Sequence, residues 1–239
     1  MPLYFRPLWT LTIAAAVAFA CLVALGVWQL DRLQWKLALI AEVNRNMAAP
    51  PVSAAQALAM GAGAEYRRVA LEGRFDNSKE AYIFGTDARG GAVYHVVVPF
   101  LTARGRWFLV DRGVVPKEKL DPATRRAGRI VGPTRVVGVW RTPEGPGLFT
   151  PSPDFAHRIW YAHDLGAIAK ADGVALAAPV VIEADATPNP GGWPSGGRTV
   201  VRFRNEHLQY AITWFGLAAV LIGVYLAYHL SRGRLGFRR

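Results

Sequence analysis

The sequence predicts an α+β membrane protein in which two transmembrane helices flank a β-rich, mainly antiparallel extracytoplasmic domain. The 239-residue chain carries a long uncharged run near each end, at 8–30 and at 208–228. Between these runs, short segments rich in β-branched and aromatic residues are separated by turn residues. This pattern is typical of an antiparallel sheet or a small barrel.

The two uncharged runs are long enough to cross a bilayer. At about 1.5 Å per residue, their 23 and 21 residues reach roughly 34 and 31 Å, against a hydrocarbon layer of about 30 Å. The first run contains a small-x-small motif at Ala18–Ala20, which is also typical of a cleaved signal peptide. Nine more uncharged residues follow Cys21, where a mature domain normally turns polar. We therefore predict two retained transmembrane helices, at 8–30 and 207–230.

The distribution of charge predicts the orientation of the chain. The net charge is +11, and the tails at 1–7 and 231–239 contain arginines but no acidic residue. Cationic ends stay on the cytoplasmic side, so both termini are expected to be cytoplasmic. The segment 31–206, which holds all 17 acidic residues, is then the extracytoplasmic domain. Its positive balance suits anionic membrane lipid, but no basic and aromatic motif indicates nucleic-acid binding.

Several chemical functions have no support in the sequence. The only cysteine, Cys21, lies inside the first predicted span, so the extracytoplasmic domain can form neither a disulfide nor a thiolate metal site. We find no Walker loop, no GxGxxG after a strand and no GxSxG elbow. No set of acid, base and nucleophile is apparent either, and we predict that the protein is not an enzyme.

The pattern in the middle of the chain predicts strands joined by short connections. In 65–75, Val69 and Leu71 alternate with Arg68 and Glu72, as in a half-buried strand. A polar linker at 44–63 precedes this strand. The other predicted elements are strands at 80–85, 93–101, 106–113, 134–141 and 178–185, short helices at 53–60 and 164–170, and a return to the membrane through the proline and glycine run at 188–197.

His207 begins the second predicted span and is the main candidate for chemistry. Tyr210, Ala211, Trp214 and Ala218 share one helical face with it. One imidazole, two large rings and two small residues suit a helix that faces a flat aromatic cofactor. The alternative is an interfacial belt in which Tyr210 and Trp214 lie at headgroup level and His207 is merely solvated. Ionisable groups at membrane depth favour a functional interpretation, and both readings stay open here.

The outer end of the first predicted helix has a matching surface. Trp28, Arg32, Trp35 and Lys36 recur there at helical spacing. Arg32 or Lys36 would pair with a carboxylate of the cofactor, because such attraction is strong where water is scarce. The alternative is that both cations only extend to the headgroup layer.

The other four histidines carry no recognised ligand spacing. His95 falls in a valine-rich strand and is interpreted as a structural residue, and His157 and His163 as surface residues. His229 lies about 33 Å along the second helix from His207, so it cannot share a metal with it from within that helix. We expect His229 to face the headgroups on the opposite side of the membrane.

Five stretches together resemble the Surfeit locus protein family of cytochrome c oxidase assembly factors. The segment "NEHLQYAITWFGLA" at 205–218 is similar to the start of the family's last span, and it is the most distinctive of the five. The others are "LGVWQLDRLQWK" at 25–36, "EYRRVALEGRF" at 65–75, and "YHVVVPF" with "LVDRGVVP" in the strands that follow. Asp111 and Val114 depart from the Asn and Trp that the family usually has there.

The resemblance implies a non-enzymatic membrane protein that helps to insert haem a into subunit I of an aa3-type oxidase. It implies haem a binding at His207, with haem A synthase as donor. Combined with the residues above, it places Tyr210 and Trp214 against the ring and Arg32 or Lys36 near the propionates. Only seven residues precede the first span, with no arginine-rich targeting segment among them, so a bacterial inner membrane and a periplasmic domain are expected. The alternative is a cofactor-free scaffold that stabilises subunit I.

Overall fold

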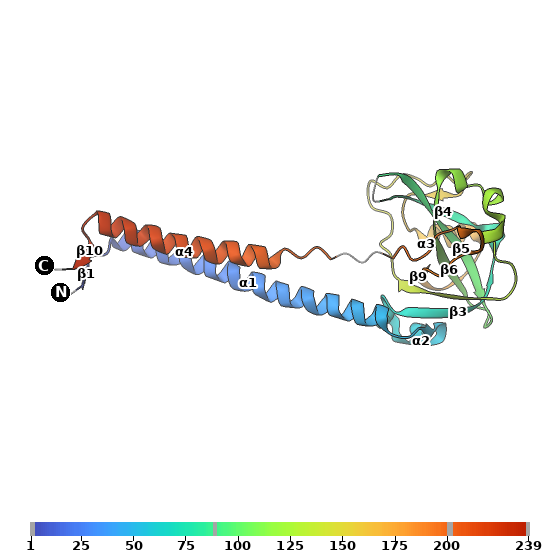
Figure 1. The fold of residues 1–239 in the computed structure, drawn as a ribbon, viewed down its shortest axis with the longest axis horizontal. Coiled ribbons are helices and arrows are strands. Elements are labelled where there is room, and N and C mark those ends of the chain that lie inside the picture. Colours follow the sequence, from blue (N-terminus) through green and yellow to red (C-terminus); the bar gives the residue numbers. More distant parts are fainter. Residues whose placement is uncertain (1–2, 88–89, 200–202, 238–239) are drawn as a thin grey trace. The chain divides into compact units, whose positions relative to one another are not determined.

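A computed structural model describes residues 3–87, 90–199 and 203–237. The chain divides into two compact units, one that joins 1–42 to 202–239 and another that comprises 43–201. Two long apolar helices lie near the termini, and a β-rich domain lies between them in the sequence (Figure 1). The predicted fold class is confirmed.

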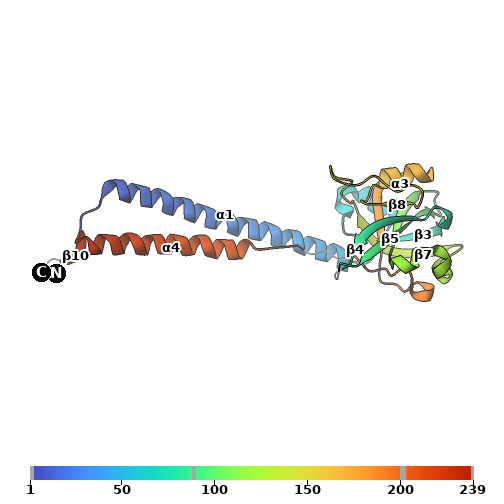
Figure 2. The same ribbon diagram turned by 90° about the horizontal axis from the view of Figure 1, so that it is seen from above.

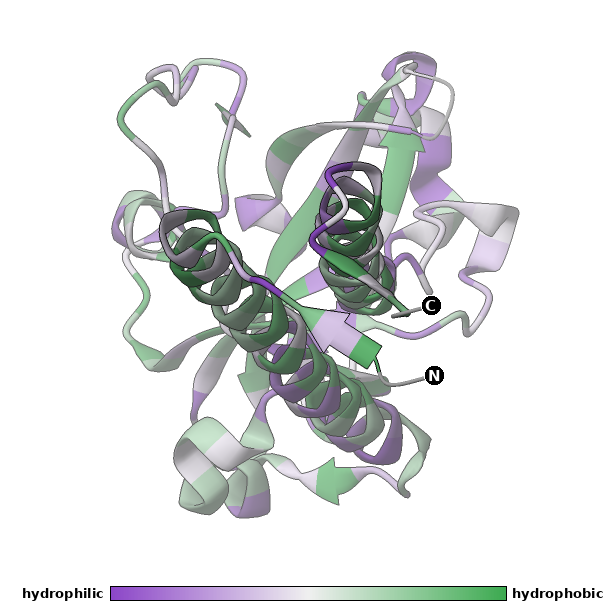
Figure 3. Cartoon of the chain, turned by 90° about the vertical axis from the view of Figure 1, so that its left-hand side faces the viewer, coloured by the Kyte–Doolittle hydropathy of each residue, from purple (hydrophilic) through white to green (hydrophobic). Residues whose placement is uncertain are grey.

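The two helices are α1 (Trp9–Ala48) and α4 (His207–Ser231), of 40 and 25 residues. Both are long and apolar enough to cross a membrane, and Figure 3 shows the predominance of apolar residues along them. α1 continues well beyond the predicted span at 8–30, because 31–48 contains good helix formers and no proline or glycine. The first residues of the predicted linker at 44–63 are therefore helical, and Pro50 and Pro51 follow the helix end.

Within the first unit, α1 and α4 are adjacent and antiparallel (Figures 1 and 2). The hydroxyl oxygens of Thr12 and Tyr225 are 2.6 Å apart near one end, and His207 meets Gln29 near the other. Two short strands, β1 (Leu3–Phe5) and β10 (Leu235–Phe237), form an antiparallel pair that joins the two ends of the chain.

Five strands of the second unit close into a barrel. Neighbouring strands follow the order β3-β7-β9-β6-β5, and β5 pairs back onto β3 through Phe75 opposite Phe100 and Gly73 opposite Thr102. Only the β6–β9 pairing in this ring is parallel, so the predicted antiparallel character holds. These strands are β3 (Arg68–Phe75), β5 (Ala92–Thr102), β6 (Trp107–Pro116), β7 (Thr134–Arg141) and β9 (Leu176–Ala184).

Shorter elements extend and cover the barrel. Both short helices were predicted, and their caps explain where they begin. Ser53 and Gln56 form a capping box at α2, and the Asp164 side chain accepts from the Ala167 amide at α3. The elements are β2 (Val52–Ser53), β4 (Ala81–Thr86), β8 (Ile159–Trp160), α2 (Ala54–Met60), α3 (Leu165–Asp172), and 3-10 helices at Gly61–Ala64, Asn77–Lys79, Lys117–Lys119, Pro122–Gly128 and Pro190–Gly192.

β6 contributes to two different cores. Phe108 and Val110 point into the barrel with Trp140, whereas Leu109 packs outside it with Trp160 and Ile168. α3 and β8 therefore cover one outer face of the barrel. This is why β6 is buried on both faces, although a strand of an antiparallel sheet often keeps one face in water.

Candidate functional site

His207 is held by a side chain from the other helix of its unit. Its Nδ1 lies 2.8 Å from Oε1 of Gln29, which is only 9% exposed. Since an amide oxygen accepts hydrogen bonds, the Nδ1–H group of His207 donates to Oε1 of Gln29. In the neutral ring, this leaves Nε2 as the nitrogen with the free lone pair. Metal-binding histidines are usually oriented in this way by a partner on the other ring nitrogen.

Small residues set the contact between the two helices. Ala211 and Ala218 are 1% and 3% exposed, and they lie on the same face of α4 as His207. On α1, a Cβ added to Gly26 would lie 2.7 Å from ring carbons of Phe215. Small residues allow helices in a membrane to approach closely. The two alanines expected to leave room for a flat cofactor are therefore taken up by helix packing.

Tyr210 and Trp214 have different surroundings. Tyr210 is 51% exposed, so its ring is available at the surface of α4. Trp214 is half-buried, and its Nε1 has no hydrogen-bond partner among the described residues. Oδ1 of Asn205, two residues before His207, is also buried and has no hydrogen-bond partner among the described residues. Enclosed polar atoms of this kind call for a missing partner such as water or a ligand.

The predicted cations of α1 lie against aromatic rings. The guanidinium carbon of Arg32 is 5.8 Å from the ring centroid of Trp28 and 5.7 Å from that of Trp35. Nζ of Lys36 is 5.0 Å from the ring centroid of Phe203. Neither cation forms an ion pair within the described ranges. Each therefore has a full charge to offer to an anion, and cation–π contacts hold it in place.

The hydrogen bond to Gln29 thus places His207 beside the turn of α1 that carries Trp28. Arg32 lies against the ring of the same Trp28. The structure forms no hydrogen bond between His207 and either predicted cation in the described part of the chain. Gln29 is the residue that sequence reasoning missed. Its signal was a polar amide side chain inside a predominantly apolar predicted span, where polar side chains commonly bond to a neighbouring helix.

A second polar cluster lies on the outer face of the barrel, on the side where Leu109 packs. His95 Nδ1 is 2.7 Å from Asp111 Oδ2, and the His163 ring centroid is 6.0 Å from that of His95. Burial lowers the pKa of His95, but the hydrogen bond and charge of Asp111 outweigh it and raise that pKa overall. Burial lowers the pKa of His163 and raises that of Glu183. His163 is half-buried, so its expected place at the surface is wrong.

The Asp111→Asn variant is expected to lower the pKa of His95, because it removes the charge that stabilises the imidazolium. In the wild type, this pair stabilises the fold fully below the unfolded histidine pKa of about 6.5. The contribution is lost as the pH rises through the higher folded pKa of His95. NMR titration of labelled histidine Cε1 measures the shift. Asp154→Asn, which alters the exposed His157 contact, is the control, and equal His95 titration in wild type and Asp111→Asn would contradict the prediction.

His229 is fully buried by neighbouring rings, which its predicted location on the headgroup side does not by itself indicate. The ring centroid of Tyr225 is 4.2 Å from that of His229, and the ring of Phe5 in β1 is 5.4 Å away. Its Nδ1 lies 2.9 Å from the carbonyl oxygen of Tyr225. The β1–β10 pairing carries Phe5 over the helix end, a contact that the sequence of α4 does not reveal.

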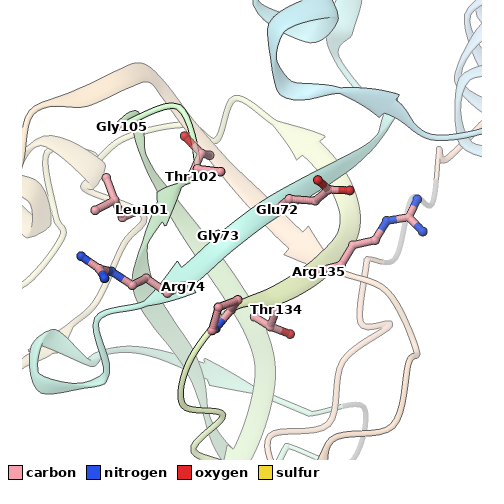
Figure 4. A pocket seen from close by; sticks show the side chains of 10 residues that line it. Glu72, Gly73, Arg74, Leu101, Thr102, Gly105, Thr134 and Arg135 are labelled. Atoms are coloured by element: carbon pink, nitrogen blue, oxygen red, sulfur yellow. The ribbon is translucent and has the colours of Figure 1, made fainter.

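The second unit contains a cavity of about 730 Å³ where β3, β5 and β7 meet (Figure 4). Glu72 of β3 and Arg135 of β7, which face each other in the strand register, line it together with Arg74. Its lining contains no histidine, so this cavity has no imidazole to offer a metal.

Comparisons with known proteins cover most of the chain. Residues 16–219 match the model of the SURF1 family. The chain is 39% identical to Surfeit locus protein 1 of Mus musculus over 88% of its own length and 72% of that protein. It is 37% identical to Surfeit locus protein 1 of Homo sapiens, with 88% and 73% covered. It is 36% identical to the Takifugu rubripes protein of the same name, with 94% and 97% covered.

Proposed function

Since this chain belongs to the SURF1 family, known as cytochrome c oxidase assembly factors, we propose that it binds haem a and aids its insertion into subunit I of an aa3-type oxidase. The observation that carries the haem proposal is the bond between His207 and Gln29. It supports an imidazole that is held in one orientation, whose neutral form would offer Nε2 to the iron.

Other residues within about two helical turns of this bond, on α1 or α4, suit the rest of the ligand. Haem a supplies an iron centre, an apolar farnesyl chain and two propionates. Arg32 and Lys36, which have no ion-pair partner among the described residues, would hold the propionates. Tyr210, Trp214 and Trp28 would pack against the ring, since each offers an aromatic side chain that helix packing has not fully covered. Because Ala211 and Ala218 are covered by packing, the ring would lie beside the helix contact and not between the helices.

The cellular setting is part of the same proposal. We place the protein in a bacterial inner membrane with both termini in the cytoplasm, and we assign 31–206 to the periplasm. Haem A synthase would be the donor, subunit I the acceptor and membrane lipid the surrounding partner, with no nucleic acid involved. The role is transfer and assembly, not catalysis. His207 would then lie at the outer face of the membrane, where the haem would be handed over.

An absorption spectrum of protein purified with and without co-expressed haem A synthase tests the proposal. We expect a haem a spectrum only with the synthase, and we expect the His207→Ala variant to lose it. His157→Ala, which removes an exposed histidine of the second unit, should keep the pigment. If His207→Ala retains full haem content and an unchanged spectrum, His207 is not the ligand.

One observation favours a second candidate, a cofactor-free scaffold that stabilises subunit I. Ala211 and Ala218 already pack closely in the helix contact, so α4 is held without a cofactor. Under this alternative, no pigment copurifies in either expression condition, yet subunit I crosslinks to the domain formed by 43–201. The pair of measurements therefore separates the two functions.

A further inference from the structure

The loop between β7 and β8 exposes two large apolar side chains almost completely. Leu148 is 99% exposed and Phe149 is 98% exposed. Single exposed apolar residues are common, but an adjacent aliphatic and aromatic pair with no covering contact is a candidate for an interaction surface. We call these two residues the apolar tip.

The apolar tip is built into a defined turn. The amide of Gly147 donates to Oγ1 of Thr150 at 2.9 Å, and the amide of Thr150 donates back to the carbonyl oxygen of Gly147 at 3.1 Å. This reciprocal pair closes a turn around Leu148 and Phe149. The two side chains are therefore presented outward by a formed structure, and little ordering is needed before they bind.

Both stems of the loop are fixed by hydrogen bonds within the second unit. On the β7 side, the amide of Thr142 donates to Oε2 of Glu65 at 2.9 Å. On the β8 side, Asp154 and Ile159 exchange two backbone hydrogen bonds of 2.8 and 2.9 Å. The apolar tip therefore projects from a loop anchored at both ends.

The composition near the apolar tip lowers the free-energy cost of moving this segment from water into a membrane. Residues 145–153, "GPGLFTPSP", contain no charged side chain. Pro146, Pro151 and Pro153 have no backbone N–H, so fewer donors lose hydration there. Unsatisfied backbone groups and charges are the main penalties for entering a bilayer, and this segment presents few of them.

We infer that Leu148 and Phe149 insert into the interfacial layer of the bilayer that α1 and α4 cross, as a third membrane contact of the chain. The small surface area of the apolar tip favours lipid over a protein as its binding partner. A phenylalanine buries about 150–250 Å², so the pair falls well short of the roughly 800 Å² per partner of a stable protein interface.

A membrane contact as small as the apolar tip is sufficient because the second unit is covalently connected to both α1 and α4. The unit that carries the apolar tip follows α1 directly and leads into α4, so it is tethered to the membrane at both of its ends. Tethering turns a weak contact into an intramolecular one with a high effective concentration. The inserted tip would fix which face of the barrel looks toward the lipid, and this inference does not depend on haem binding.

Site-specific fluorescence in lipid nanodiscs tests the inference with the full-length chain. In a Cys21→Ser background, Phe149→Cys is labelled with an environment-sensitive nitrobenzoxadiazole dye. We expect blue-shifted emission, strong quenching by lipids brominated near the top of the acyl chain, and several-fold weaker quenching by iodide than at a water-exposed site. Adding Leu148→Ser should reverse much of the shift, because it removes the remaining apolar side chain of the tip beside the dye.

The matched control is Ala171→Cys, an exposed position of α3 in the same unit. Equal iodide quenching at both positions, with no effect of brominated lipid, would place the apolar tip in water and overturn the inference. Protection from iodide without quenching by brominated lipid would also overturn it. That result would mean that the tip packs against protein, either this chain or a second copy.

Discussion

Replacing Gln29 with alanine is expected to weaken the proposed binding of haem a by about 10- to 100-fold, the usual cost of losing the partner that orients a metal-binding histidine. Gln29 is a positioning residue, since it bonds to Nδ1 of His207 and would not touch the iron itself. Without it, the ring is free to rotate and to change its tautomer. Titration of haem a into apo-protein in nanodiscs, followed by absorption, measures the affinity.

Two further variants distinguish positioning from simple packing. Gln29→Glu keeps an acceptor opposite Nδ1, so it should recover most of the affinity and shift the absorption spectrum through a more basic ligand. Gln34→Ala removes an exposed glutamine of the same helix and should bind as the wild type does. An unchanged affinity in Gln29→Ala would show that the hydrogen bond has no part in ligand binding.

Replacing Arg125 with methionine is expected to lower the free energy of unfolding of the barrel unit by about 3–5 kcal/mol, because a buried carboxylate loses its counter-charge. Arg125 and Glu80 form an ion pair in which both residues are buried, at 5% exposure each. Nε of Arg125 also donates to the Lys119 carbonyl oxygen at 2.8 Å. Urea-induced unfolding of the full chain in nanodiscs, read by pulse proteolysis, measures the change.

The double variant Glu80→Gln/Arg125→Met tests the reason for the loss. It removes both charges and leaves an amide oxygen to accept from the Tyr82 hydroxyl, which now donates to Glu80 at 2.7 Å. We expect it to recover part of the stability, since replacing both partners of a buried pair costs less than removing one. Arg126→Met, at the exposed neighbouring position, is the matched control. A loss in Arg125→Met no larger than in Arg126→Met would refute the account.

The elements that were predicted well are those with local signals. The strand β3 follows from the alternation of Val69 and Leu71 with polar residues, and the structure buries both of them at 0% and 1% exposure. The helix α3 begins at its Asp164 cap and ends at Gly173 in the left-handed region, φ 63°. Each signal lies within a few residues of the element it specifies, so no knowledge of the tertiary fold was needed.

The errors have two physical origins. His163 was assigned to the surface because its own segment looks exposed, yet His95 from β5 lies against it. The burial of His229 was missed for the same reason, since Phe5 from β1 lies against its ring. The length of α1 was underestimated for another reason. A charged segment ends a predicted membrane span, but it does not end a helix, and residues 31–48 continue the helical backbone to Ala48.

The sequence by itself determined the two apolar helices, the period of the strands, the family and the candidate histidine, because these depend on composition and on spacing along the chain. Only the tertiary structure decided that β5 closes onto β3, that Glu80 meets Arg125 and that Gln29 orients His207. Gln29 and His207 are 178 positions apart. Such pairs depend on strand register and on how the helices are rotated against each other. Contacts such as that of Gly26 with Phe215 set this rotation, and no local pattern encodes it.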